Sequence, residues 1–126
     1  MYGRNQYLQT QVKTARPEEI IVMLYDGMMT RIERLNAAIV EEDPAESSLL
    51  VDRLMDILSH LQATLLSEHA PELAAHLSTT YETWTKIIVQ SRIRKDPTAL
   101  STVHQQMAEL RDAWAQAVSP AHVQAA

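Results

Sequence analysis

The 126-residue sequence contains no cysteine, no phenylalanine and only two glycines. Without cysteine the chain forms no disulfide, holds no zinc through thiolates and uses no thiol in catalysis. Two glycines are too few for the glycine-rich loop that surrounds a phosphate group in nucleotide-binding proteins. These absences exclude several common classes of enzyme and metalloprotein.

Basic residues and long apolar runs are also scarce. Eleven Lys and Arg stand against 16 Asp and Glu, which gives a net charge of −5. This acidic excess argues against binding of DNA, RNA or anionic lipid. No stretch reaches the ~20 mostly apolar residues of a membrane span, and the first residues lack the apolar segment of a signal peptide. We therefore expect a cytoplasmic protein that binds no nucleic acid and inserts into no membrane.

Hydrophobic residues make up 46% of the chain, which is too many for a disordered polypeptide. The length is that of one domain with one modest core. Proline, a residue well tolerated at the first position of a helix, opens four stretches of periodic apolar residues. The spacing predicts helices over 17–41, 44–68, 71–94 and 97–118. Asp43, directly before the second, has the side chain of a good N-cap, whereas Arg16 is a poor one.

Each predicted connection has only a few residues, so consecutive helices must run antiparallel. No alternating run of β-branched residues predicts a strand. The sequence therefore predicts an all-α, antiparallel four-helix bundle over residues 17–118. An N-terminal arm over 1–16 and a C-terminal tail over 119–126 complete the expected organisation.

The predicted helices differ in how far their apolar residues spread around the axis. Successive residues of a helix are 100° apart around its axis. On this scale the apolar residues of the first and second predicted helices cover arcs of roughly 160° and 180°, whereas those of the third and fourth cover roughly 120° and 80°. A helix facing one core needs little more than about 100°. Three explanations stay open: the first two helices are the most buried, they form a dimer seam, or they line a groove for a partner chain.

The chain offers few candidates for chemistry. Five histidines are present, but no Glu-x-x-His motif of the kind that builds a di-metal site in a bundle core. Ser59 and His60 are adjacent, and adjacent residues do not face each other on a helix. No loop is available to serve a Ser/His/Asp triad. We expect no metal, no cofactor and no enzymatic activity.

Asp26 and Gly27 stand out inside the first predicted helix. A glycine in a helix interior costs ~1 kcal/mol relative to alanine, so a close backbone approach at Gly27 would explain it. Asp26 would then accept a hydrogen bond from the arm or from a neighbouring helix. The alternative is an acid that is simply solvated.

The N-terminal arm contains Tyr2, Tyr7, Leu8 and Val12 in otherwise polar sequence. A tyrosine ring can bury ~150 Å² or more on an apolar surface while its hydroxyl stays in water. Such an arm can cover a groove while the groove is empty and be displaced by a partner. A frayed terminus is the alternative.

The segment 7–27, YLQTQVKTARPEEIIVMLYDG, resembles the opening of the FliS family of flagellar secretion chaperones. That family has a tyrosine-containing arm, a Val-x-Thr/Ser-Ala-x-Pro turn and a helix with a Leu-Ile-x-Met-Leu-Tyr/Phe-Asp-Gly block. The matching residues are Val12, Thr14, Ala15, Pro17, Ile20, Ile21, Met23, Leu24, Tyr25, Asp26 and Gly27. Weaker matches follow at Glu72, Leu73, Ala74, Leu77, Tyr81, Asp96 and Trp114. Ala70-Pro71 replaces the Gly-Gly that the family often has before its third helix.

The resemblance implies a cytoplasmic helical bundle that binds the disordered C-terminal region of flagellin. Such a chaperone prevents premature polymerisation and assists delivery to the flagellar type III export gate. A self-associating bundle without a flagellin client, including a homodimer, remains the alternative. We expect ten residues to contact the client. Three come from the arm (Tyr7, Leu8 and Val12), five from the outer edges of the broad apolar arcs (Tyr25, Met29, Met55, Leu58 and Leu66), and Tyr81 and Trp84 of the third predicted helix are further candidates.

Overall fold

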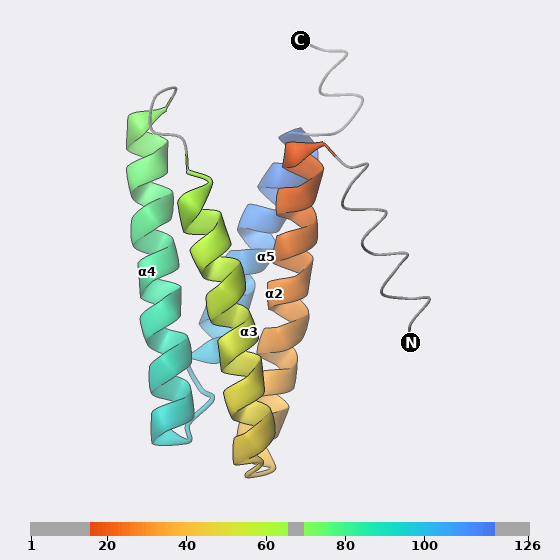
Figure 1. Ribbon diagram of the computed structural model, residues 1–126, viewed down its shortest axis with the longest axis vertical. Coiled ribbons are helices and arrows are strands. Elements are labelled where there is room, and N and C mark those ends of the chain that lie inside the picture. The colour runs from red at the N-terminus through yellow and green to blue at the C-terminus, as the bar shows by residue number, and fades with distance from the viewer. Residues whose placement is uncertain (1–15, 66–69, 118–126) are drawn as a thin grey trace.

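The structure is a computed structural model that describes residues 16–65 and 70–117. Four helices form an antiparallel bundle with α3 in front and α5 behind (Figure 1). Their bounds are Pro17–Val40 for α2, Pro44–Ala63 for α3, Pro71–Arg94 for α4 and Leu100–Ala117 for α5. No strand occurs in these ranges. The predicted all-α four-helix bundle is confirmed.

The residues that begin the helices behave largely as their chemistry predicts. Pro17, Pro44 and Pro71 each open a helix. Asp43 is the N-cap of α3, and its carboxylate accepts a hydrogen bond from the backbone N–H of Glu46 at 3.1 Å. Arg16 gives α2 no side-chain cap and instead pairs with Glu19 at 3.0 Å.

The predicted start of the last helix at 97 is wrong, because Asp96 holds a turn. Its carboxylate accepts hydrogen bonds from the backbone N–H and the hydroxyl of Thr98, at 3.0 and 2.6 Å. An acidic side chain that accepts hydrogen bonds from the residue two positions ahead stabilises a turn. The helix therefore begins only at Leu100. The predicted extension of the second helix to 68 is also not observed, since α3 ends at Ala63 and Thr64 closes it by donating to the carbonyl of Leu61.

One hydrophobic core joins all four helices. Packing is closest between α2 and its two neighbours, α3 and α5, and less close between α3 and α4 and between α4 and α5. The largest buried side chains are Trp84, Tyr25 and Tyr81. The aromatic residues of α2 and α4 therefore occupy the centre of the bundle.

The turns that end α2 and α4 share one geometry. In each, a residue in the left-handed backbone region follows the helix: Glu42 with φ of 55° and Lys95 with φ of 56°. The backbone N–H of Asp43 donates a hydrogen bond to the carbonyl of Ala38 at 2.9 Å, and the backbone N–H of Asp96 donates one to the carbonyl of Ser91 at 3.0 Å. Glycine usually occupies such a position, because it has no Cβ to clash. Both turns therefore hold a charged residue in a strained conformation.

We predict that Lys95→Gly raises the free energy of unfolding by about 0.5–1 kcal/mol, because relief of the left-handed strain exceeds the greater chain entropy of glycine. Chemical denaturation measures the change. Lys86→Gly is the control, since the same substitution inside α4 should lower stability by about 1 kcal/mol. A destabilised Lys95→Gly variant would contradict the assignment of strain to this turn.

Candidate functional site

An apolar hollow of about 210 Å³ lies at the end of the bundle where α2 and α4 begin and α3 and α5 end. We call it the apolar hollow. Its wall comes from all four helices and the residues that follow or precede them: Ile21, Leu61, Thr64, Leu65, Ala70, Leu73, Ala74, Leu77, Tyr81 and Trp114. Leu73 leaves 54% of its surface exposed there. The hollow is therefore suited to apolar side chains from another segment.

The first turns of α2 extend this apolar surface. Five consecutive residues, Ile20 to Leu24, are apolar and each is only partly buried. Five residues in a row cover every side of a helix, and a helix that is apolar all round normally lies in an interior. Ile21 belongs to both this segment and the apolar hollow. The described residues thus leave a continuous apolar surface partly open at this end.

The floor beside the hollow is a cluster of three aromatic rings. The hydroxyls of Tyr25 and Tyr81 form a hydrogen bond of 2.8 Å. The Tyr25 ring meets those of Tyr81 and Trp84 edge-on, at centroid distances of 6.5 and 6.1 Å. The indole N–H of Trp84 donates to the side-chain oxygen of Gln106 at 2.8 Å. The cluster links α2 to α4 and α4 to α5, and all its buried polar groups are hydrogen-bonded.

Burial raises the pKa of Tyr25 well above its usual range, and the hydrogen-bonded Tyr81 adds to the increase. Burial also raises the pKa of Tyr81. Both hydroxyls therefore stay protonated at neutral pH. The lining of the apolar hollow contains no charged side chain, which suits an apolar partner better than an ionic one.

The structure places the ten sequence-predicted site residues in three groups. Tyr25, Leu58, Tyr81 and Trp84 are buried in the core, at most 2% exposed. Met29 and Met55 are partly exposed and pack against the core. The other four, Tyr7, Leu8, Val12 and Leu66, lie outside the described residues.

Four of the predicted wall residues therefore lie in the interior rather than on a surface, and only Tyr81 also lines the apolar hollow. The edge of the α2 arc at Tyr25 was expected to face a partner, but it faces Tyr81 and Trp84 of α4. Whether these residues act in client binding stays a prediction. Leu61 and Leu73 of the apolar hollow were not among the predicted site residues. Their apolar character is evident from the sequence, but the sequence does not show that they meet at one end of the bundle.

The surplus of apolar residues on α2 and α3 is buried for the most part. Of the ten apolar residues in the arc of the first helix, one is exposed, Val40; four are partly exposed, Ile21, Val22, Leu24 and Met29; and five are buried, Tyr25, Met28, Ile32, Leu35 and Ile39. Of the described residues in the second arc, five on α3 are buried, Leu50, Val51, Leu54, Leu58 and Leu61, and three are partly exposed, Met55 and Ile57 on α3 and Leu65 after its end. Deep burial thus accounts for much of the surplus, and the partly exposed remainder includes Ile21 and Leu65 at the apolar hollow.

Asp26 accepts two hydrogen bonds from the guanidinium of Arg111 on α5, at 2.8 and 3.4 Å. The expected bond from a neighbouring helix is confirmed. Because both side chains are partly exposed, the pair contributes at most about 1 kcal/mol. The expected close backbone approach at Gly27 is wrong: a Cβ there would meet only side-chain atoms, Nη1 of Arg31 at 3.2 Å and Cδ1 of Ile57 at 3.8 Å.

Among residues 16–65 and 70–117, no group of three His, Asp or Glu side chains is arranged to hold a metal ion. None of the four described helices has the length and apolar character to cross a membrane. The fold and the site together define a class: an antiparallel helical bundle that presents an apolar surface at one end.

The comparisons with known proteins give this class its family. The sequence matches the family model described as Flagellar protein FliS over residues 1–121. It is 31% identical over 112 residues to the flagellar secretion chaperone FliS of Bacillus subtilis, covering 89% of this chain and 83% of that protein. The flagellar secretion chaperone FliSB of Pseudomonas aeruginosa is 27% identical over 107 residues, which is 85% of each chain. The chain belongs to the FliS family of flagellar secretion chaperones, which are not enzymes.

A solved crystal structure of a bacterial flagellar chaperone shares the fold. It superposes with a TM-score of 0.77 and covers 94% of this chain and 96% of its own, at 17% sequence identity. The bundle architecture is thus common to sequences that have diverged widely.

We predict that Tyr25→Phe and Tyr81→Phe each lower the free energy of unfolding by about 1–2 kcal/mol, because each removes the hydrogen bond between the two buried hydroxyls. The double variant should lose about 1 kcal/mol less than the sum of the two. Denaturant unfolding of the four proteins gives this coupling. Strict additivity would show that the two hydroxyls do not stabilise each other.

The same variants have an expected pH dependence. The folded state holds both phenol protons to a higher pH than the unfolded chain does. Stability from this difference is complete below the ordinary tyrosine pKa and is lost as the pH rises above about 10. The loss should be smaller in the double phenylalanine variant than in the wild-type chain.

Proposed function

We propose that this chain is an export chaperone that binds the disordered C-terminal region of flagellin in the cytoplasm. By binding this region it prevents premature polymerisation of flagellin and assists its delivery to the flagellar type III export apparatus. The export gate is a further proposed contact. The family membership of the chain supports the chaperone class. The observation that carries the client-binding surface is the partly exposed, all-round apolar start of α2 beside the apolar hollow.

The proposed binding is driven by apolar burial. A disordered client loses chain entropy when it becomes ordered, so the interaction must bury a wide apolar area to remain favourable. Apolar side chains of the client would fill the apolar hollow and contact Leu73 there. Neighbouring client side chains would cover the apolar residues from Ile20 to Leu24. Because the burial is apolar and the lining of the apolar hollow carries no charged side chain, binding should show a negative heat-capacity change and little dependence on salt.

The N-terminal arm is the proposed competitor of the client. A chain spans at most about 3.6 Å per residue, so the five residue steps from Val12 to Pro17 can span at most about 18 Å, and the ten from Tyr7 about 36 Å. Ile21, four residues further on, lines the apolar hollow. We propose that Tyr7, Leu8 and Val12 cover this surface while it is empty and leave it when the client binds.

The remaining sequence-predicted residues take two proposed roles. Leu66 follows directly after Leu65 of the hollow and would extend its wall. Met29 and Met55, partly exposed and flexible, would contact client segments that continue along the bundle. Tyr25, Leu58 and Trp84 are buried beneath the surface, so they would support the hollow through packing.

We predict that Leu73→Gln weakens binding of a flagellin C-terminal peptide about fivefold, since burial of a half-exposed leucine is worth about 1 kcal/mol. Titration calorimetry measures the affinity. Leu49→Gln is the matched control, because Leu49 on α3 is 50% exposed, close to the 54% of Leu73, but lies far from the apolar hollow. Equal losses in both variants would rule out the hollow as the specific client site.

We predict that deletion of residues 1–12 leaves the bundle folded and makes peptide binding tighter or leaves it unchanged, because the arm competes with the client. Circular dichroism checks the helices, and calorimetry checks the affinity. If the truncated chain keeps its helicity but no longer binds the peptide, the arm holds the client directly and the competition mechanism is wrong.

A further inference from the structure

The packing of the bundle is uneven around α4. Of the four pairs of neighbouring helices, α4 and α5 pack least closely, and α3 and α4 come next. Within residues 16–65 and 70–117, no salt bridge joins α4 to another helix. The helix is therefore held to the bundle by its apolar side chains and by hydrogen bonds.

Two hollows lie along the line of contact between α4 and α5, which we call the seam. The first encloses about 470 Å³, with Thr83 and Trp84 of α4 on one wall and Gln106 and Leu110 of α5 on the other. We call it the seam hollow. A second hollow of about 570 Å³ continues the seam toward the α4–α5 turn. The two helices thus leave unfilled space between them along much of their shared length.

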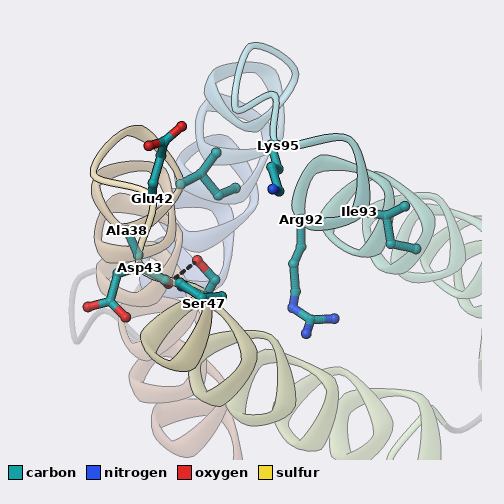
Figure 2. A pocket seen from close by; sticks show the side chains of 9 residues that line it. Ala38, Glu42, Asp43, Ser47, Arg92, Ile93 and Lys95 are labelled. Carbon is teal, nitrogen blue, oxygen red and sulfur yellow. Dashed lines mark hydrogen bonds between the residues drawn. The ribbon is translucent and has the colours of Figure 1, made fainter.

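A further hollow separates the end of α4 from the α2–α3 turn (Figure 2). It encloses about 450 Å³, and Ser47 and Arg92 line it from opposite sides. Figure 2 shows Arg92 extending into this space. Ile93, on the last turn of α4, leaves 62% of its surface exposed there. The last turns of α4 therefore have unfilled space on two sides.

The hydrogen bonds that join α4 to other helices are confined to its middle. Among the described residues there are three, and their α4 members lie between Ser78 and Trp84. Two of them lead to α2 and α3. The third crosses the seam, because the indole N–H of Trp84 donates to the side-chain oxygen of Gln106 at 2.8 Å. In this part of the chain, a single hydrogen bond therefore holds α4 against α5.

The middle of α4 is also intrinsically a weak helix. Four threonine hydroxyls each donate to the backbone carbonyl four residues earlier, at 2.9 to 3.1 Å: those of Thr79, Thr80, Thr83 and Thr85. A β-branched threonine is a poor helix former, and such bonds weaken and often bend a helix. Most of the stability of a helix in a protein comes from tertiary packing. Loss of contact with α5 therefore loosens this segment first.

The seam hollow adjoins the apolar hollow. Tyr81 lines the apolar hollow and Trp84 lines the seam hollow, and the centroids of the two rings are 5.6 Å apart. On α5, Leu110 lines the seam hollow, and Trp114, about one helical turn further on, lines the apolar hollow. Separation of α4 from α5 therefore joins the two hollows and exposes apolar side chains on both walls.

We propose that the bundle opens at the seam between α4 and α5, and that the Trp84–Gln106 hydrogen bond holds this seam shut. The closed apolar hollow, at about 210 Å³, is smaller than the roughly 300 Å³ at which typical ligand pockets begin. Opening supplies the wider apolar surface that an ordered client must cover, beside the rings of Tyr81 and Trp84. Entry of the client rests on the proposed function, whereas the opening itself does not.

Hydrogen–deuterium exchange of the full-length chain without client, followed by mass spectrometry, tests the opening. Amides of residues 78–87 should exchange faster than those in the middle of α2 and α3. Gln106→Met removes the acceptor but keeps the length of the side chain, so it should raise exchange in this segment about fivefold and leave α2 and α3 unchanged. Gln106→Glu keeps an acceptor and should stay within about twofold of the wild-type chain.

Two controls accompany these variants. Gln105→Met changes the exposed neighbour of Gln106, which does not line the seam hollow, and should leave exchange unchanged. Thr79→Ala/Thr83→Ala strengthens the helix at two exposed positions and should slow exchange of residues 78–87 about fivefold, whereas Thr30→Ala on the exposed face of α2 should not.

Two results would overturn the opening. One is equal acceleration of exchange in all four helices by Gln106→Met, which would show a global loss of stability instead. The other is a wild-type chain in which residues 78–87 exchange no faster than the middle of α2 and α3.

Titration calorimetry with a peptide of the flagellin C-terminal region tests entry of the client. A partner that binds only the open form gains affinity in proportion to the open fraction, so Gln106→Met should bind about fivefold more tightly and Thr79→Ala/Thr83→Ala about fivefold more weakly. Unchanged affinities alongside altered exchange would show that the client does not enter the seam. A wild-type chain that binds no peptide would overturn the proposed function, and the exchange measurements would still decide whether the seam opens.

Discussion

The structure depends on the buried contact between Tyr25 of α2 and Tyr81 of α4. The two hydroxyls lie 2.8 Å apart where both side chains are inaccessible to solvent. A buried hydroxyl without a partner is costly, and the two tyrosines satisfy each other, with Trp114 of α5 as a further hydrogen-bond partner of Tyr25. The contact, closed by the ring of Trp84, fixes α4 against α2 across the bundle. Because Tyr81 also lines the apolar hollow, the same contact sets the shape of the candidate client surface.

The two ends of the bundle differ in the physics of recognition that they offer. One end presents leucine, isoleucine and tryptophan side chains around protonated tyrosines, and such a surface gains affinity from apolar burial. The other end presents charges of both signs, Glu42 and Asp43 on one side and Arg92 and Lys95 on the other, around a hollow of about 450 Å³. Helices of 18 to 24 residues separate the two ends.

Local chemistry made much of the fold predictable. Asp43 caps α3, prolines open three helices, and the apolar periodicity located α2 and α4 to within a residue. The failures also have physical causes. Proline at 97 suggested a helix start, but the Asp96 carboxylate binds Thr98 and holds a turn instead. Gly27 suggested a close backbone contact, but its neighbours are the side chains of Arg31 and Ile57.

The sequence by itself determined the helices, their antiparallel order, the family resemblance and the excess of apolar residues on α2 and α3, because these follow from spacing along one chain. Only the tertiary structure decided which apolar residues face inward. Tyr25 and Trp84 lie in the core, while Leu73 and Ile21 lie at the open end. It also brought Glu42 and Lys95, more than 50 residues apart in sequence, to one hollow. Periodicity gives the angle of a residue around its own helix, but not which neighbour stands at that angle.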